Sequence, residues 1–255
     1  MAIILIIMFV LGAVFGSFYY VLGSRLPKGE SIVKPGSHCE FCNHSLTWYE
    51  LIPVFSYIIQ LGKCRECKNR IPFTYCLIEI VTGLLFALAY LLFGISYEFF
   101  SALIIFSLLI LIFITDFKYM IILDSPLIIS SLLIFILKWY FFGYKACLNA
   151  FLSGTIIFLL MFVIKKIGDI VFKKESLGGG DIKFAFVIGA ILGIKLSLVA
   201  LILSSFLAFP YAFAVINLEK TKELPFGPFL VSALTLVFIF MDKFTDLIYY
   251  LFPGI

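Results

Sequence analysis

The sequence predicts an all-α polytopic membrane protein with about eight membrane-spanning helices and one small cytosolic, zinc-ribbon-like loop. Hydrophobic residues make up 63% of the 255-residue chain and charged residues only 13%, whereas soluble domains are near half apolar and a quarter charged. The apolar residues also form uninterrupted runs near the ~20 residues that a spanning helix needs. Several spans therefore fit in a lipid bilayer, but a large soluble catalytic domain does not. The net charge of +4 is small and does not indicate nucleic-acid binding.

The first predicted span covers residues 1–22. It carries no charged side chain, no Lys or Arg precedes it, and no small-residue cleavage site follows it, so we expect a retained helix rather than a cleaved signal peptide. Further apolar runs with little or no charge predict the next four spans, at residues 75–93, 99–114, 121–142 and 146–164.

The remaining apolar segments predict three more spans. Residues 184–216 would form one helix of about 50 Å at a rise of ~1.5 Å per residue, which is too long for a hydrocarbon core of ~30 Å. We therefore expect two helices that meet at Gly193. A last span runs from residue 229 towards 251, and Asp242, Lys243 and Asp246 make its end amphipathic.

The basic residues predict how the chain is oriented. With eight spans, 15 of the 19 Lys and Arg residues fall on one side of the membrane. They lie in the loop at 23–74, in the later loops on that side, and at the helix ends that adjoin these loops. Lys220 and Lys222 are among the 15, in the loop before the last span. Because cytoplasmic loops carry an excess of Lys and Arg, this side is predicted to be cytosolic and both termini extracytoplasmic.

The loop at 23–74 contains two C-x-x-C pairs, and four thiolates at such spacing are ligands that tetrahedral zinc prefers. Two disulfides are the alternative, but a cytosolic loop lies in a reducing compartment, which favours zinc. A closed four-cysteine site is structural, because it leaves no open position for substrate. His38 and His44 flank the first pair and could replace a ligand, although we expect them to be bystanders. The predicted ligands are Cys39, Cys42, Cys64 and Cys67.

Four carboxylates lie within or at the edge of predicted spans, where ionisable groups are costly and therefore mark candidate functional sites. They are Glu79, Asp116, Asp124 and Asp181. The predicted topology brings the three aspartates to one depth, on the cytosolic side. Two such carboxylates can share a proton and activate a water molecule between them. Glu79 could instead pair with a basic residue of the cysteine loop or extend to the interface.

Asp181 follows three glycines, at the predicted start of a helix. Glycine permits close backbone approach or a positive φ, so Gly178 and Gly180 are supporting candidates. The alternative is that Asp181 is only an N-cap, and Asp124, which Ser125 and Pro126 follow, could also be one. Asp116 and Asp124 could also be ordinary acids of a solvated loop.

Several motifs, in the same order along the chain, resemble those of the type IV prepilin peptidases, polytopic aspartic enzymes of the GxGD group. They include both C-x-x-C pairs, Glu79, and Asp116 followed eight residues later by Asp124. Further matching motifs include Gly16-Ser17-Phe18, Ser24-Arg25-Leu26-Pro27, Trp48-Tyr49-Glu50-Leu51-Ile52-Pro53-Val54, Gly178 to Lys183 and Pro225-Phe226-Gly227-Pro228-Phe229. Tyr20 and Leu123 depart from the family pattern, which commonly has Asn and Pro there.

The resemblance implies that Asp116 and Asp181 are the catalytic pair, with Asp124 matching a further acid of the family and Lys183 belonging to the glycine motif. It also implies that the four cysteines bind zinc. Family members cleave the basic leader of type IV prepilins or pseudopilins after a Gly, and many then methylate the new N-terminus with S-adenosylmethionine. Glu50 lies at a position linked with that methylation.

The resemblance further implies a bacterial inner-membrane protein whose active site faces the cytosol. The corresponding domain organisation is a first spanning helix at 1–22, a zinc-binding loop associated with methylation at 23–74, and a peptidase core at 75–255. No oligomeric state follows from the sequence, and no glycine-rich nucleotide-binding fingerprint is present.

Two other function classes use some of the same features. An ion-coupled transporter also places carboxylates in the membrane, but its binding sites lie near the midplane between inverted repeats, and no such repeat is found here. A membrane scaffold that docks a partner through the zinc loop would account for the cysteines but not for Gly178 to Asp181. The sequence therefore favours the peptidase.

Overall fold

The computed structural model describes residues 1–218 and 224–251, and every regular element within these ranges is a helix. The predicted all-α polytopic class is thereby confirmed. The chain divides into two compact units, Met1–Phe99 and Phe100–Ile255. Lys220 and Lys222, which we assigned to the cytosolic side, lie outside the described residues.

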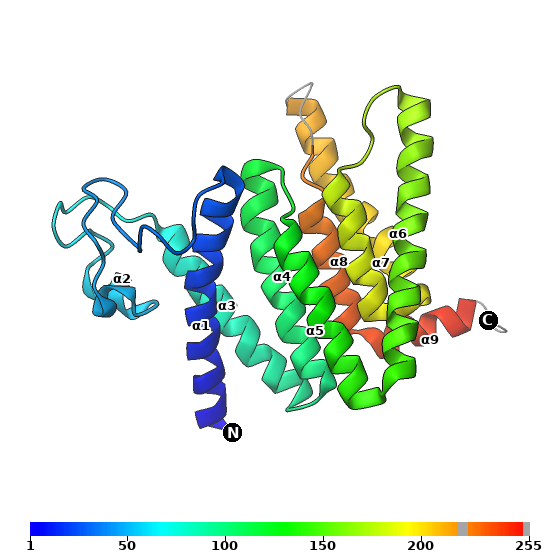
Figure 1. Cartoon of the computed structure of the whole chain (residues 1–255), viewed down its shortest axis with the longest axis horizontal. Helices are drawn as coiled ribbons and strands as arrows, with labels where there is room; N and C mark the ends of the chain where they lie inside the picture. The colour runs from blue at the N-terminus through cyan, green and yellow to red at the C-terminus, as the bar shows by residue number, and fades with distance from the viewer. Residues whose placement is uncertain (219–223, 252–255) are drawn as a thin grey trace. The chain divides into compact units, whose positions relative to one another are not determined.

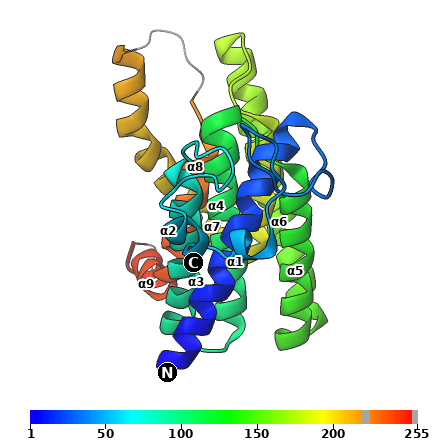
Figure 2. The same cartoon turned by 90° about the vertical axis from the view of Figure 1, so that its left-hand side faces the viewer.

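In the first unit, α1 (Ala2–Arg25) packs along α3 (Phe73–Phe93), as Figures 1 and 2 show. Glycines permit this packing: a Cβ atom added to Gly12 would lie 2.6 Å from the carbonyl oxygen of Thr82, and one added to Gly83 would lie 2.8 Å from that of Phe9. Small residues at such contacts let two membrane helices approach closely, where dispersion contacts hold them together.

The loop between these two helices contains three short helical elements. They are η1 (Leu26–Lys28), η2 (Trp48–Leu51) and α2 (Phe55–Ile59). This loop is the polar segment that the sequence predicts, and it holds all four candidate metal ligands.

The second unit contains six helices in its described residues. Its core lies on α8, where Leu230, Val231, Ala233 and Leu234 are fully buried, and on α4 and the first part of α7. The helices are α4 (Tyr97–Tyr119), α5 (Asp124–Phe142), α6 (Tyr144–Phe172), α7 (Gly179–Leu218), α8 (Gly227–Ile239) and α9 (Met241–Leu251).

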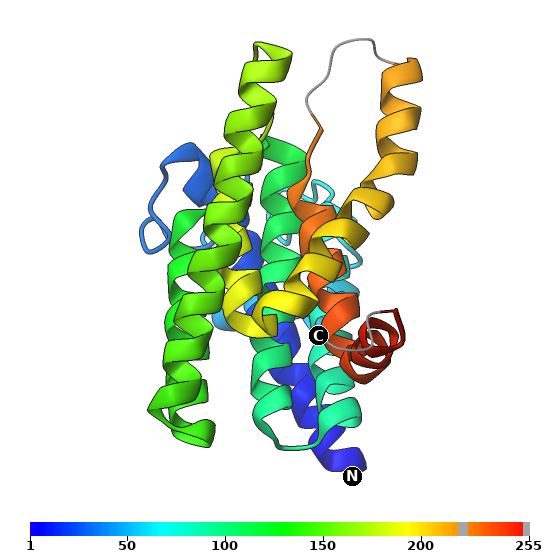
Figure 3. The ribbon, with the colours of Figure 1, turned by 90° about the vertical axis from the view of Figure 1, so that its right-hand side faces the viewer.

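Helix α7 is bent at Gly193, whose φ of 75° and ψ of 177° are not helical. In Figure 3 this helix, drawn from yellow to orange, has two arms that run in different directions. The bend frees carbonyl groups that a continuous helix would satisfy. Lys138 Nζ donates to the carbonyl oxygens of Ala190 and Ile191, at 2.8 and 3.2 Å, and Ser197 Oγ donates to that of Ile188 at 3.2 Å. Non-helical backbone at membrane depth persists where neighbouring helices supply such donors. The bend falls at the residue where the sequence predicted two helices to meet.

Six described helices are long and apolar enough to cross a membrane, or seven if the bent pair α8 and α9 counts as one span. The predicted number of eight spans is reached only when the bent pair counts as one span and the two arms of α7 are also counted separately. The expectation of a continuous last span was wrong, because α9 turns by 87° from α8. Its charged side chains explain the turn: Asp242, Lys243 and Asp246 share one side of α9, and such a side avoids hydrocarbon.

Candidate active site

Asp116 and Asp181 come together in the second unit although they lie far apart in the sequence. Asp116 is in the last turn of α4 and Asp181 in the first turn of α7, and only 6% and 8% of these residues is exposed. The two carboxyl groups are close enough for the charge of Asp116 to act on Asp181. The structure therefore contains a pair of buried, interacting acids.

The Asp116 side chain contacts the start of α8. The backbone N–H of Gly227 donates to Asp116 Oδ2 at 2.9 Å, which places a carboxylate at a helix N-terminus, where negative charge is favoured. A Cβ atom on Gly227 would lie 2.8 Å from that same oxygen. A side chain at position 227 would crowd this oxygen, so glycine suits the contact. The sequence predicted no role for Gly227, although its place between Pro225 and Pro228 is a signal of a special backbone position.

The glycine motif before Asp181 has two crowded positions and one open one. The backbone N–H of Gly178 donates to the Asp181 carboxylate, and a Cβ atom there would lie 3.1 Å from Asp181 Oδ2. A Cβ atom on Gly180 would lie 2.8 Å from Cβ of Ile122, whereas one on Gly179 would meet nothing within 4 Å. The Gly-x-Gly spacing thus corresponds to two close approaches. Asp181 is the third residue of α7, so it is not simply the N-cap.

Ile122 lies between the two acidic segments. Its Cβ atom faces Gly180, and its Cδ1 atom would lie 2.9 Å from a Cβ atom on Gly227. It belongs to the short turn between α4 and α5 and so contacts the backbone beside both aspartates. Sequence reasoning missed this residue, because one isoleucine in an apolar chain carries no signal.

Asp124 does not join the acid pair. It is the first residue of α5, and its Oδ1 and Oδ2 atoms accept from Lys183 Nζ at 2.8 and 2.7 Å. The N-cap of α5 is Leu123, so the alternative in which Asp124 caps the helix was wrong. Both side chains are about half exposed, and a pair of this kind contributes roughly 0–1 kcal/mol. Its effect is to hold the start of α5 against that of α7.

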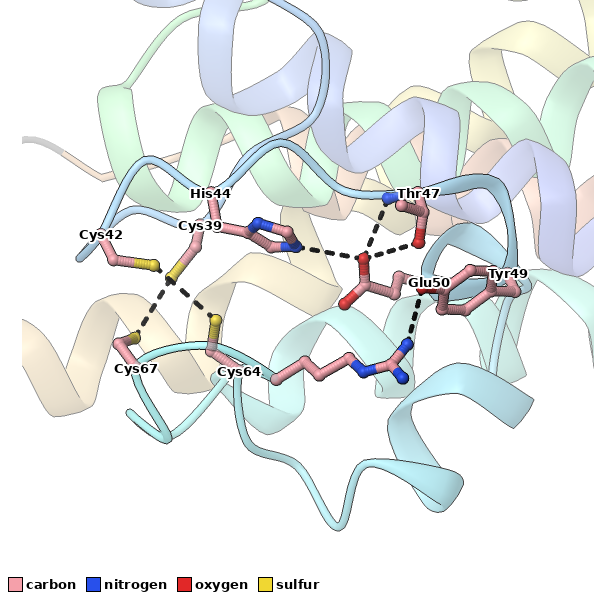
Figure 4. A network of polar contacts seen from close by, with 9 residues as sticks. Cys39, Cys42, His44, Thr47, Tyr49, Glu50, Cys64 and Cys67 are labelled. Atoms are coloured by element: carbon pink, nitrogen blue, oxygen red, sulfur yellow. Dashed lines mark hydrogen bonds and ion pairs between the residues drawn. The ribbon is translucent and has the colours of Figure 1, made fainter.

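The four predicted metal ligands form a cluster in the first unit. The Sγ atoms of Cys39, Cys42, Cys64 and Cys67 all lie within 4.8 Å of one another (Figure 4). The Cys39–Cys67 and Cys42–Cys64 Sγ distances are 3.8 and 3.9 Å. Four sulfurs around one zinc, at ~2.3 Å from it, would lie about 3.8 Å apart. These distances fit a metal, and they are far above the ~2.05 Å of a disulfide bond.

The two C-x-x-C segments share one backbone geometry. In the first, the N–H of Cys39 donates to the His44 carbonyl at 2.9 Å, and in the second, the N–H of Cys64 donates to the Asn69 carbonyl at 2.8 Å. Asn43 and Lys68, each four residues after the first cysteine of its pair, have φ values of 57° and 59°. This repeated turn brings both cysteines of each pair to the same side.

The thiols differ in how readily they ionise. Burial raises the pKa of Cys39, but hydrogen bonds from the backbone N–H groups of Cys42 and Phe41 and from neighbouring thiols outweigh it and bring the pKa to about 7. At Cys42 the backbone N–H of His44 lowers the pKa, whereas burial and the three neighbouring thiols raise it to about 12. Four thiolates so close together repel one another, so a bound cation is needed for all of them to ionise.

Glu50 is buried beside this cluster, with only 1% of its side chain exposed. Its Oε2 atom accepts from the backbone N–H and Oγ1 of Thr47 at 2.9 and 2.7 Å and contacts Nε2 of His44 at 3.3 Å (Figure 4). Burial raises the pKa of Glu50, but the hydrogen bonds from Thr47 outweigh it and leave the pKa below its ordinary value. Oε1 has no hydrogen-bond partner among the described residues.

The histidines are not part of the sulfur cluster. The ring of His44 contacts Glu50, and Nδ1 of His38 contacts the carbonyl oxygen of Gly36 at 2.8 Å. The four Sγ atoms form the metal-sized group without either ring. This agrees with the expectation that both histidines are bystanders.

Glu79 connects the cysteine loop to the helix pair of the first unit. It is buried in α3, where it accepts from the backbone N–H of Val54 at 2.7 Å and from the Ser17 hydroxyl of α1. Among the described residues its partners are therefore neutral donors. The expectation of a basic partner or of a side chain extending to the interface was wrong, because the loop backbone folds back onto α3.

Comparisons with known proteins divide the chain at the same place as its fold. A family model described as the bacterial peptidase A24 N-terminal domain matches residues 10–93, and one described as the type IV leader peptidase family matches residues 103–213. No solved structure matches the chain.

Relatives named prepilin leader peptidase/N-methyltransferase are similar over most of the chain. The protein of Bacillus subtilis (strain 168) is 37% identical, over 93% of this chain and 94% of the relative. That of Myxococcus xanthus is 36% identical, over 73% of this chain and 56% of the relative. That of Vibrio cholerae is 26% identical, over 92% of this chain and 96% of the relative.

Proposed function

Because this chain belongs to the type IV leader peptidase family, we propose that it cleaves the basic leader of type IV prepilins or pseudopilins, with Asp116 and Asp181 as the catalytic residues. One observation carries the proposal most directly. Two aspartates from different helices interact while more than nine-tenths buried, and backbone N–H groups of glycines donate to both. A buried acid pair is costly, and its usual explanation is catalysis.

In the proposed mechanism the pair holds one proton. The ionised aspartate takes a proton from a water molecule, whose oxygen attacks the scissile carbonyl carbon. The protonated aspartate donates a hydrogen bond to the carbonyl oxygen and stabilises the charge that develops there. The proton taken from water then passes to the leaving amine as the C–N bond breaks. No covalent intermediate with the enzyme forms.

The surrounding residues are positioning residues in this proposal. Gly178 and Gly227 donate to the two carboxylates, and Gly180 lets the α7 start pack against Ile122. The pair Asp124–Lys183 fixes the neighbouring helix start. A small movement of a reacting group can reduce a rate about 100-fold, so these contacts matter although they do not touch substrate.

The many apolar helices and the family make this an inner-membrane protein. We further propose that both termini are extracytoplasmic and that the acid pair lies towards the cytosol. Lys165, Lys166, Lys173, Lys174 and Lys183 cluster in sequence around the start of α7, as the positive-inside rule expects on the cytosolic side. A prepilin leader, which is basic and precedes an apolar helix, would meet the acids at that depth.

We also propose that the loop at 23–74 binds structural zinc and takes part in N-methylation of the cleaved product, while the peptidase core lies within 75–255. The fit of the sulfur distances to zinc supports the first part. The combined name of the relatives supports the second, with S-adenosylmethionine as the methyl donor. Glu50, with one unpaired buried oxygen, is the residue of this loop that we associate with methylation.

The test is co-expression with a prepilin, followed by intact-mass measurement of the pilin. We expect the wild type to remove the leader, and Asp116→Asn and Asp181→Asn each to abolish its removal while the enzyme still inserts in the membrane. Asp242→Asn, which makes the same change at an exposed acid of α9, is the matched control and should cleave normally. Leader removal by either active-site variant would refute the assignment. A cleaved product without an added methyl group would refute only the methylation.

A further inference from the structure

Helix α2 turns its apolar side chains outwards and its polar ones inwards. Phe55, Ile58, Ile59 and Leu61 are 60%, 61%, 79% and 83% exposed, whereas Ser56, Tyr57 and Gln60 are partly buried. A helix in a solvated loop shows the opposite arrangement, and a contiguous exposed apolar surface marks an interaction site. We refer to the outward-facing group Phe55, Ile58, Ile59 and Leu61 as the α2 apolar face.

Hydrogen bonds hold α2 beside α3 rather than beyond its end. Val54, immediately before α2, donates its N–H to Glu79, which lies six residues inside α3 and so about 9 Å along its axis. Val54 has a φ of 65°, unusual for a β-branched residue, so the connection is kept at some cost in backbone strain. Figures 1 and 2 show α2 at the level of the first half of α3.

A second contact joins α2 to the outer side of α3. The Tyr57 hydroxyl donates to the carbonyl oxygen of Ile71 at 3.3 Å, and its ring lies 6.0 Å from that of Phe73. Phe73 itself is more than half exposed and belongs to a row of exposed apolar residues along one side of α3, with Leu77 and Leu84. A spanning helix turns such a row to lipid. The α2 apolar face therefore adjoins a lipid-facing surface.

Basic residues follow the α2 apolar face directly. Within residues 63–70 four exposed cations accompany one acid, Glu66. Cations that flank an apolar surface at the membrane are attracted to anionic headgroups. The four are Lys63, Arg65, Lys68 and Arg70.

We propose that α2 is inserted in the bilayer, with the α2 apolar face at the boundary of headgroups and acyl chains in the leaflet next to the cysteine loop. The lipid bilayer is thus the partner of this surface. The four basic residues lie at the anionic headgroups. The insertion fixes the cysteine cluster, of which Cys64 lies three residues after Leu61, against the membrane surface instead of leaving it on a free loop.

Tryptophan fluorescence tests this directly, because the chain has only two tryptophans, Trp48 and Trp139. The full-length protein with both replaced by Phe receives Ile59→Trp and is reconstituted in vesicles of phosphatidylcholine and phosphatidylglycerol. Lipids brominated near the headgroup end of the acyl chain quench an inserted indole, whereas aqueous iodide quenches an exposed one. We expect at least a twofold loss of fluorescence with the brominated lipid and little loss with iodide.

Two reference variants calibrate the measurement. Leu77→Trp, on the lipid-facing side of α3 near its start, should be quenched by brominated lipid, and Phe41→Trp, between two metal ligands, should be quenched by iodide. Bound zinc and a single elution peak show that each variant is folded, and Leu61→Trp replaces Ile59→Trp if that variant fails these criteria. Quenching of the α2 probe by iodide would mean that α2 is in water. Protection from both quenchers would mean that protein covers it. Either result overturns the proposal.

Discussion

The glycine motif at the start of α7 allows a sharp test, because two adjacent glycines differ in their surroundings. A Cβ atom at Gly180 would lie 2.8 Å from Cβ of Ile122, against 3.4–4 Å for ordinary contact, whereas one at Gly179 would meet nothing within 4 Å. The Ile122 Cβ atom is fixed to the backbone, so no change of rotamer can relieve the contact. Gly180→Ala must therefore displace the turn between α4 and α5 relative to α7.

The size of the effect follows from this displacement. Overpacking of this kind costs about 1–3 kcal/mol of stability. Because Asp116 and Asp181 sit on the two segments that move apart, misplacement by up to ~1 Å lowers the cleavage rate by as much as about 100-fold. Position 179 is helical and an alanine side chain there would meet no other atom within 4 Å. Gly179→Ala should therefore change the stability by no more than about 1 kcal/mol, in the stabilising direction.

The assay is the initial rate of leader removal from a prepilin in membranes, normalised to the amount of inserted enzyme. We expect Gly180→Ala to lose at least tenfold and Gly179→Ala to stay within twofold of the wild type. Ile122→Ala should not rescue Gly180→Ala, because it retains the Cβ atom that collides, whereas Ile122→Gly should rescue it in part. Equal rates for the two glycine variants would refute the reasoning.

Three further predictions concern other parts of the molecule. The Cys64→Ser variant should contain no bound zinc, as measured by elemental analysis, and should not methylate its product, but it should still cleave the leader. Loss of cleavage as well would contradict the separation of the two activities. Lys138→Met should leave the carbonyls of Ala190 and Ile191 without their donor and destabilise the folded protein by about 1–3 kcal/mol, which would appear as a lower Tm in detergent. Lys145→Met, which makes the same change at an exposed lysine, should not lower the Tm. Because folding lowers the pKa of Glu50, its contribution is present above the unfolded pKa of ~4.3 and decreases as the pH falls below that value. Glu50→Gln should therefore lower the Tm at pH 7, and the difference from the wild type should shrink as the pH is lowered below ~4.3. A Tm difference that does not change with pH would show that charge is not involved.

The sequence correctly predicted those parts of the fold that depend on the bilayer or on the local spacing of residues. The apolar runs located the spanning helices because hydrocarbon imposes a length on each. The same arithmetic identified Gly193 as a break, where the backbone is indeed non-helical. The four cysteines formed one cluster because ligand spacing is a local property.

The parts that it missed depend on contacts between distant residues. Nothing around Glu79 in the sequence indicates that the N–H of Val54 is its partner, since that bond requires the loop to fold back. The 87° turn between α8 and α9 was hidden because the apolar residues of α9 keep the mean hydropathy of the segment high enough to resemble a span. The Lys183–Asp124 pair joins two helix starts that only tertiary packing brings together.

The broken helix α7 also constrains how the protein is made. Its free carbonyls at Ala190 and Ile191 depend on the ammonium group of Lys138, which belongs to α5. Since α5 precedes α7 along the chain, the ribosome delivers the donor to the membrane before the acceptors emerge. The lone lysine of α5 is costly in lipid until α7 arrives, and the bend of α7 is costly without the lysine. Each therefore favours the insertion of the other, so that translation order and membrane assembly proceed in the same direction.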